Sequence, residues 1–343
     1  MSSTSDPSHP THLDPSELGT KEYWDRYYQN DLDNDKDDDD PNSDDDNDDD
    51  DDNDDHNPPD PSELESWFDD VGAPAKTLAF LTSTTFPLSP NYIPSQPTDS
   101  TSTSTSPSSP QQQEADRPAP TVLDLGTGNG SALFSLRLEG GYMGPMVGVD
   151  YSTQSIELAM KLARQYSSSS SDSGNISFHV LDLINDDPTT RSWWPADSNG
   201  FDLVLDKGTF DAISLSSATV QVPTDADSTT TQIPTDPDSD HSTTTTTTTT
   251  ERRVCELYPA KVLNMVRPGG FLLVTSCNWT EDEVVAWFTG AAATGTTTAT
   301  GNETSREGGR FQVYDTIKYP VFEFGGQKGQ GVASVCFRKI IET

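Results

Sequence analysis

The sequence has few cysteines, few basic residues and no long apolar run, and each absence excludes a class of protein. Its three cysteines, Cys255, Cys277 and Cys336, lie far apart without Cys-x-x-Cys or Cys/His ligand spacing, so we expect no metal site. No apolar run approaches the roughly 18 residues of a membrane span. The N-terminus lacks the charged start and apolar stretch of a signal peptide. We therefore expect a soluble cytoplasmic protein with no membrane partner.

Basic residues are outnumbered by acidic ones, 20 to 57, which gives a formal net charge of -37. Phosphate repulsion then argues against a nucleic-acid partner. The acidity suits a basic protein partner through long-range steering, or it only keeps the chain soluble. The segment Asp31 to Asp55 alone contains seventeen aspartates and one lysine.

Apolar residues make up 31% of the chain, below the roughly 45–50% of a typical globular protein, so much of the chain cannot be core. Stretches dominated by Asp, or by Ser, Thr, Gly and Pro, are read as flexible. The expected organisation is a disordered tail over 1–15, a lid helix over 16–31, a disordered acidic insertion over 32–60, and one domain over 61–343 with low-complexity insertions at 95–117, 217–250 and 289–309.

Short apolar runs alternate with helix-like segments along the rest of the chain. Strands are expected over 121–126, 146–150, 176–183, 201–206, 271–277, 311–324 and 332–341, and helices over 131–139, 152–166 and 251–266. This alternation predicts an α/β fold with a doubly wound parallel sheet. The last two strands have no helix between them, so they are expected to form an antiparallel hairpin.

The stretch VLDLGTGNG (122–130) places Gly126, Gly128 and Gly130 after a buried strand. A dinucleotide fingerprint needs a third glycine where Ser131 stands, and no phosphate loop ending in Gly-Lys-Ser/Thr is present. Asp124, two residues before the first glycine, would repel a pyrophosphate but could hold an ammonium group. The loop therefore favours a ligand without phosphate.

Two more acids end the next two strands. Asp150 could accept both hydroxyls of a ribose, and Asp182, followed by Leu183, could accept from an adenine amino group. Together with Asp124 they describe S-adenosylmethionine as the ligand. Taken singly, each is also explained as a helix cap or a solvated side chain.

Five stretches carry a resemblance to a known family. They are LGTKEYWDRYYQND (18–31), VLDLGTGNG, FDLVLDKGTFDAI (201–213), VRPGGFLLVTSCNWT (266–280) and VFEFGGQKGQGV (321–332). They resemble the seven-strand protein-lysine methyltransferases that act on translation elongation factor 1-alpha. The resemblance implies a doubly wound, seven-stranded Rossmann-like methyltransferase sheet with a C-terminal antiparallel hairpin, and a monomer that uses S-adenosylmethionine. The acidic insertion between the N-terminal helix and ESWFDDVG (65–72) departs from the family pattern.

The fourth strand ends in Asp206 and Lys207 instead of the Asn/Asp-Pro-Pro-Tyr motif of enzymes that methylate planar amines. Asp206 could orient a lysine amine at the ligand-binding edge of the sheet, or it could cap the next turn with Lys207 paired to it. Asn278 and Trp279, after the fifth strand, are candidates for the substrate channel.

Trp24 and Tyr28 share one face of the N-terminal helix with Tyr27. They could cover the donor or only dock the helix on the core.

No histidine is assigned as a base, because His179 lies within a strand and the other four fall in stretches expected to be disordered. Three alternatives to protein methylation stay open: methylation of a small molecule, a non-catalytic protein that binds the donor, and a nicotinamide-dependent oxidoreductase. Ser131 and Asp124 disfavour the last.

Overall fold

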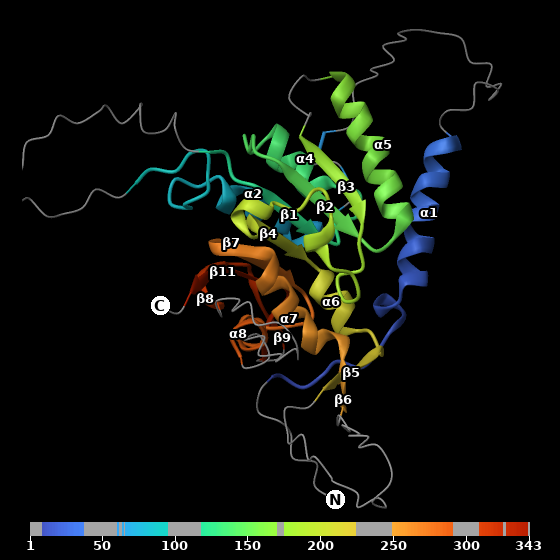
Figure 1. Cartoon of the computed structure of the whole chain (residues 1–343), viewed down its shortest axis with the longest axis vertical. Coiled ribbons are helices and arrows are strands. Elements are labelled where there is room, and N and C mark those ends of the chain that lie inside the picture. Colours follow the sequence, from blue (N-terminus) through green and yellow to red (C-terminus); the bar gives the residue numbers. More distant parts are fainter. Residues whose placement is uncertain are drawn as a thin grey trace, which may run out of the picture.

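A seven-stranded sheet organises the chain in the order β3-β2-β1-β4-β7-β11-β8 (Figure 1). The computed structural model describes residues 9–37, 60–61, 64, 66–94, 118–169, 175–223, 249–290, 309–324 and 327–341. The strands are β1 Val122–Leu125, β2 Met146–Asp150, β3 Ile176–Val180, β4 Phe201–Lys207, β7 Val266–Ser276, β8 Gly309–Ile317 and β11 Ala333–Ile341. β3, β2, β1, β4 and β7 run parallel, whereas β11 is antiparallel to both β7 and β8. This is the expected doubly wound sheet with its C-terminal antiparallel pair.

Both faces of the central strands are covered, so β1 and β2 are buried at every position, whereas the edge strand β8 is mostly exposed. In β1, Leu123 and Leu125 point into one buried cluster and Val122 into another, as the two-residue period of a strand requires. β7 divides its side chains in the same way, with Leu272 and Val274 on the first face.

Helices form the two outer layers. They are α1 Lys21–Asp37, α2 Ala73–Leu81, α4 Ser131–Leu138, α5 Thr153–Ser169, α6 Thr209–Ser214, α7 Val254–Met265 and α8 Glu281–Thr289. α1, α2, α4 and α5 bury side chains in one cluster, and α6, α7 and α8 in the other. Figure 1 shows α1 lying alongside α5, so the N-terminal helix belongs to the first layer. None of the described helices is both long and apolar enough to cross a membrane.

The structure extends and corrects several expectations. The lid helix expected over 16–31 begins at Lys21 and continues to Asp37, into the stretch expected to be disordered. α2, α6 and α8 were not expected. The single strand expected over 311–324 is two, β8 and β9 Val321–Phe324, and β9 pairs with β10 Gln327–Gln330 in a small hairpin inserted between β8 and β11.

The low-complexity stretches are described only at their edges. β5 Thr219–Pro223 and β6 Thr249–Arg253 lie at the two ends of the expected insertion 217–250 and pair with one another. Most of the acidic insertion, the whole of 95–117 and most of 289–309 lie outside the described residues. Residues 9–15, expected within a disordered tail, are described and are joined to α7 by a hydrogen bond from Arg253 to Leu13.

Candidate functional site

A cavity of about 420 Å³ lies at the carboxyl ends of β1 and β4, next to the glycine loop. Its lining residues are Tyr27, Tyr28 and Asp31 of α1, Ser66 to Asp70, Gly126 to Asn129 with Ser131, and Lys207. The volume is within the range of roughly 300–1,000 Å³ typical of small-molecule sites. The carboxyl ends of parallel strands are also where ligands of such sheets bind.

The glycine loop needs glycine for two physical reasons. Gly126, Gly128 and Gly130 have φ of 61°, 58° and 85°, a region that other residues rarely adopt. A Cβ on Gly126 would lie 2.1 Å from the Thr209 hydroxyl, and one on Gly128 would lie 2.6 Å from the Tyr28 hydroxyl. Gly126 and Gly128 line the cavity, whereas Gly130 lies behind the loop.

Asp124 and Lys207 set the charge at the base of the cavity. Asp124 is buried and accepts a hydrogen bond from Thr127 Oγ1 at 2.8 Å. Burial raises the pKa of Asp124 to about 6, against the effects of the Thr127 hydroxyl and the Lys207 ammonium. Burial also lowers the pKa of Lys207, while Asp124, Asp69 and Asp206 oppose that change. Lys207 lines the cavity, whereas Asp124 does not line it and contacts the loop through the Thr127 hydroxyl.

The two acids expected at the ribose and the adenine have backbone partners. Asp150 is buried, and its two oxygens accept from Gly128 N at 3.2 Å and Ser152 N at 2.9 Å. Asp182 accepts from backbone N–H groups of the turn that follows it, at 2.8 and 3.0 Å. Leu183 is in the core. None of Asp150, Asp182 and Leu183 lines the cavity, so their contact with the donor stays a prediction.

Asp206 is buried and has three hydrogen-bond donors. One oxygen accepts from Thr209 N and Phe210 N, at 3.0 and 3.1 Å, and so caps the start of α6. The other accepts from the Tyr258 hydroxyl of α7 at 2.7 Å. Burial raises the pKa of Asp206 to about 7, with these donors opposing the rise and nearby Asp211 adding to it. The capping role is present, and the side chain does not reach the cavity wall.

The two candidates after β7 lie in different surroundings. Trp279 is buried, stacks on the Phe210 ring with centroids 6.1 Å apart, and belongs to the core. Asn278 is exposed, and neither residue lines the cavity. The loop that carries them is held by Asp211, whose carboxylate accepts from the Ser276 hydroxyl. Asp211 belongs to the stretch FDLVLDKGTFDAI (201–213) and does not line the cavity.

Aromatic side chains of α1 form one wall of the cavity. Tyr27 and Tyr28 line it, and their rings meet edge to face with centroids 5.1 Å apart. Trp24 does not line the cavity but packs edge to face against Trp67, which does, at 5.3 Å. Tyr27 and Tyr28 therefore cover the cavity, as the first expectation for this face of α1 had it. Trp24 instead packs behind the wall, which is closer to the docking role.

The segment Ser66 to Asp70 forms the opposite wall, and sequence reasoning did not assign it to the site. Phe68 has a φ of 70°, which is unusual for a bulky residue and occurs most often where a site demands it. Asp69 and Asp70 are exposed at the cavity, and Asp69 accepts from Ser66 N at 2.9 Å. The acidic and aromatic residues of ESWFDDVG (65–72) are the feature of the sequence that could have indicated this part of the site.

A family comparison decides what kind of protein contains this cavity. The model of the methyltransferase domain family matches residues 116–326, more than half of the chain. The match spans β1 to β9 and includes the glycine loop and Lys207. The chain belongs to this family.

Curated relatives of the methyltransferase match more of the chain than the family model does. It is 29% identical to the protein-lysine N-methyltransferase EFM4 of Saccharomyces cerevisiae, over 95% of this chain and 96% of that protein. It is 33% identical to the Schizosaccharomyces pombe protein of the same name, over 63% of this chain and 68% of that one. It is 30% identical to the EEF1A lysine methyltransferase 2 of Homo sapiens, over 63% and 64%.

The cavity of the methyltransferase fits the methyl donor that the family implies. S-adenosylmethionine carries a sulfonium, an ammonium and a carboxylate. The wall offers the acidic residues Asp31, Asp69 and Asp70 and the basic residue Lys207, and Asp124 lies just beneath. Charge and volume both match the donor, whereas a pyrophosphate would face an excess of like charge.

Proposed function

We propose that this methyltransferase transfers a methyl group from S-adenosylmethionine to a lysine of translation elongation factor 1-alpha. The observation that carries the proposal is the similarity to a protein-lysine N-methyltransferase over 95% of the chain. The human relative is an EEF1A lysine methyltransferase, and we infer the substrate from it.

Bound S-adenosylmethionine supplies a methyl group activated by a sulfonium. The target lysine must first lose a proton, which costs about 4–5 kcal/mol at pH 7 for an amine of pKa near 10.4. Asp69 and Asp70 are exposed at the cavity, where they attract the incoming ammonium. The rings of Tyr27, Trp67 and Phe68 then exclude water and stabilise a cation. The proton leaves the lysine nitrogen for solvent, so alignment is the main catalytic requirement.

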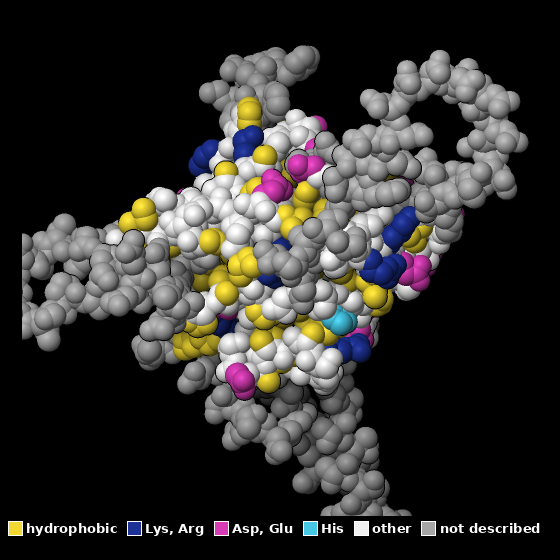
Figure 2. Space-filling view, turned by 90° about the horizontal axis from the view of Figure 1, so that it is seen from above, with side chains coloured by type: hydrophobic (Ala, Val, Ile, Leu, Met, Phe, Trp, Pro, Cys, Tyr) yellow, Lys and Arg dark blue, Asp and Glu magenta, His cyan; other side chains and the backbone are white. Residues whose placement is uncertain are grey.

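The wider surface supports a protein substrate. On the face in Figure 2, the described acidic and basic side chains are interspersed with apolar ones, so no single-sign field dominates that face. The chain as a whole is acidic, with a net charge of -37. This charge favours encounter with a basic protein. We place the reaction in the cytoplasm, because the three cysteines are free, as in a reducing compartment, and we propose that the monomer is the active unit.

The test is incubation of the full chain with radiolabelled donor and purified elongation factor 1-alpha. We expect label on one lysine, located by mass spectrometry. An Asp69→Asn/Asp70→Asn double variant should lower labelling by roughly 5- to 30-fold through a higher KM, the equivalent of about 1–2 kcal/mol. Asparagine keeps the acceptor for Ser66 N and removes only the charge.

Asp197→Asn is the matched control, because Asp197 is exposed on a 3-10 turn and does not line the cavity. Equal loss in the control and the double variant would contradict the role of Asp69 and Asp70. Absence of label on the factor, with donor binding intact by calorimetry, would keep the donor site and reject the substrate.

A further inference from the structure

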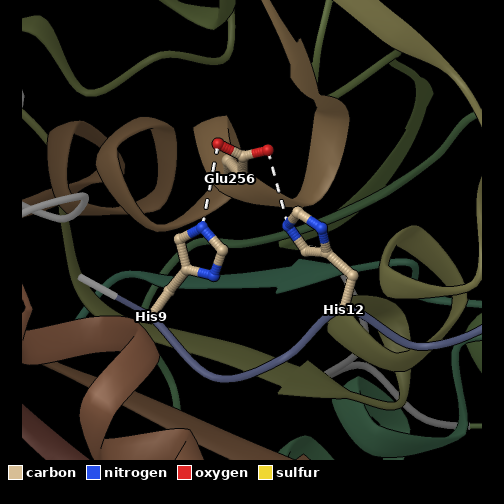
Figure 3. Close-up of side chains that lie close together, drawn as sticks. All are labelled: His9, His12 and Glu256. Atoms are coloured by element: carbon tan, nitrogen blue, oxygen red, sulfur yellow. Dashed lines mark ion pairs between the residues drawn. The ribbon is translucent and has the colours of Figure 1, made fainter. Parts of the chain in front are cut away.

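Two histidines and a glutamate meet where the N-terminal segment crosses α7. Figure 3 shows the rings of His9 and His12 both turned toward the carboxylate of Glu256. His9 Nε2 lies 4.0 Å from one oxygen and His12 Nε2 lies 3.4 Å from the other. One ligand atom of each residue lies within 4.8 Å of the ligand atoms of the other two. This cluster is separate from the cavity, whose lining contains none of the three.

The ring of His9 is held in one orientation. Its Nδ1 lies 2.8 Å from the carbonyl oxygen of Pro10, and a carbonyl can only accept, so Nδ1 carries the proton. In the neutral ring, Nε2 is then the nitrogen with a free lone pair, and it lies on the side of Glu256. The ring also stacks on Trp287, with centroids 4.8 Å apart and planes 9° apart. A backbone carbonyl on the far ring nitrogen is the usual support of a metal-binding histidine.

His12 has a buried nitrogen that lacks a partner. Its Nε2 is inaccessible to solvent and makes no hydrogen bond, although Glu256 is near. Buried polar atoms are rarely left without a hydrogen bond, and a bound ion is one of the ordinary reasons.

Glu256 is fixed as well, and it keeps binding capacity. Its oxygens accept from Arg252 Nε at 2.8 Å and from Arg253 N at 2.9 Å. Each carboxylate oxygen has two lone-pair sites, so one remains on each for a further partner. The positive charge of Arg252 opposes a cation here, while its hydrogen bond orients the carboxylate.

We propose that His9, His12 and Glu256 bind a divalent first-row transition metal such as Zn²⁺. Two imidazoles and one carboxylate are a known zinc ligand set, with water in the fourth position. Metal–ligand bonds of about 2.0–2.1 Å at tetrahedral angles put ligand atoms roughly 3.4 Å apart. Because the atoms lie within 4.8 Å of one another, side-chain rotations must bring them together by up to about 1.4 Å.

The metal would clasp the N-terminal segment to α7. That segment continues into α1, whose Tyr27 and Tyr28 line the cavity, and α7 carries Tyr258, the partner of Asp206. The site thus joins the covering helix to the helix that positions the end of β4. Its role is structural, and the methyl transfer itself does not use it.

The test is a titration of the full chain with Co²⁺, which reports its coordination by visible absorption. Oxygen-only ligands favour octahedral geometry, so the aspartate-rich segment would not give the intense band of four-coordinate Co²⁺. We compare wild type with His9→Gln and His12→Gln. His179→Gln is the matched control, because His179 lies on β3 and packs on Trp193.

We expect one equivalent of Co²⁺ with a four-coordinate spectrum, displaced by Zn²⁺. Either His9→Gln or His12→Gln should weaken binding at least tenfold, and the control should not. Metal should raise the Tm of wild type and of the control only. The proposal would be overturned if the spectrum were unchanged by the two substitutions, or if no metal bound at micromolar concentration. The contact between His12 and Glu256 would then be an ion pair only.

Discussion

Replacing Tyr258 with phenylalanine removes one hydroxyl and tests how the buried acid of β4 is held. In the folded chain this hydroxyl donates to Asp206 at 2.7 Å, and Asp206 is only 2% exposed. A hydrogen bond to a charged group contributes about 1.5–3 kcal/mol, whereas one between neutral groups contributes about 0.5–1.5 kcal/mol. The Tyr258→Phe variant should therefore be destabilised by about 1.5–3 kcal/mol where Asp206 is ionised, and by less where it is protonated.

The sign of the pH dependence follows from the pKa of Asp206. Folding raises this pKa from 3.8 to about 7, so the folded state binds the proton more tightly than the unfolded state. The associated stability is complete below pH 4 and is lost as pH rises through 7, by about 4 kcal/mol in all at about 1.4 kcal/mol per pKa unit. The Tyr258 hydroxyl lowers the pKa of Asp206, so Tyr258→Phe raises this pKa further and extends the loss of stability to higher pH.

Urea denaturation of the full chain at pH 5 and pH 8 measures both quantities. We expect the destabilisation by Tyr258→Phe to be about 1 kcal/mol larger at pH 8 than at pH 5. Tyr142→Phe is the control, because the Tyr142 hydroxyl is buried and donates to the neutral carbonyl of Leu81 at 2.7 Å. The same loss at both pH values in Tyr258→Phe would refute the assignment of a titrating Asp206.

Two further predictions concern the loop and the core. Gly128→Ala should lower the free energy of unfolding by about 1–2 kcal/mol, because alanine is strained at positive φ. It should also displace the Tyr28 hydroxyl and so weaken donor binding, which calorimetry measures. Gly72→Ala is the control: its φ is 65° but only a flexible side chain is nearby, so it should lower stability in the same way and leave donor binding intact. Trp279→Ala should cost about 3–5 kcal/mol in denaturation experiments, whereas Asn278→Ala at the exposed neighbour should cost under about 0.5 kcal/mol. Equal effects within either pair would contradict the placement described above.

The parallel strands could be predicted from sequence because burial on both faces makes them apolar throughout. The segments 121–126, 146–150 and 201–206 coincide with β1, β2 and β4 within a residue at each end. Helices with weaker patterns were missed. α8 had a readable start, since Thr280 and Glu283 form a capping box, but its nine residues border a Gly, Ala and Thr stretch that suggested a loop.

The candidate site was predictable where the requirement is local. The loop needs positive φ at Gly126 and Gly128, and the glycines that meet this need can be recognised in the sequence. The opposite wall does not, because Phe68 and Asp69 reach the cavity only when a segment far from the loop in the chain folds across it. His12 and Glu256 lie still further apart in sequence, so only the fold brings the two together.

The acids at the strand ends show why residue type and position did not separate ligand contact from capping. A strand that ends at a helix or turn leaves backbone N–H groups without partners, and a carboxylate at that point is the most effective acceptor. Asp150, Asp182 and Asp206 all accept such groups. Each oxygen of a carboxylate retains a second lone pair, so capping does not by itself prevent binding. Access distinguishes Asp150 from Asp182: Asp150 accepts from Gly128 N in the loop that lines the cavity, whereas Asp182 accepts from backbone groups of its own turn. Of these acids, Asp150 is therefore the one whose removal should disturb the donor site through the loop backbone.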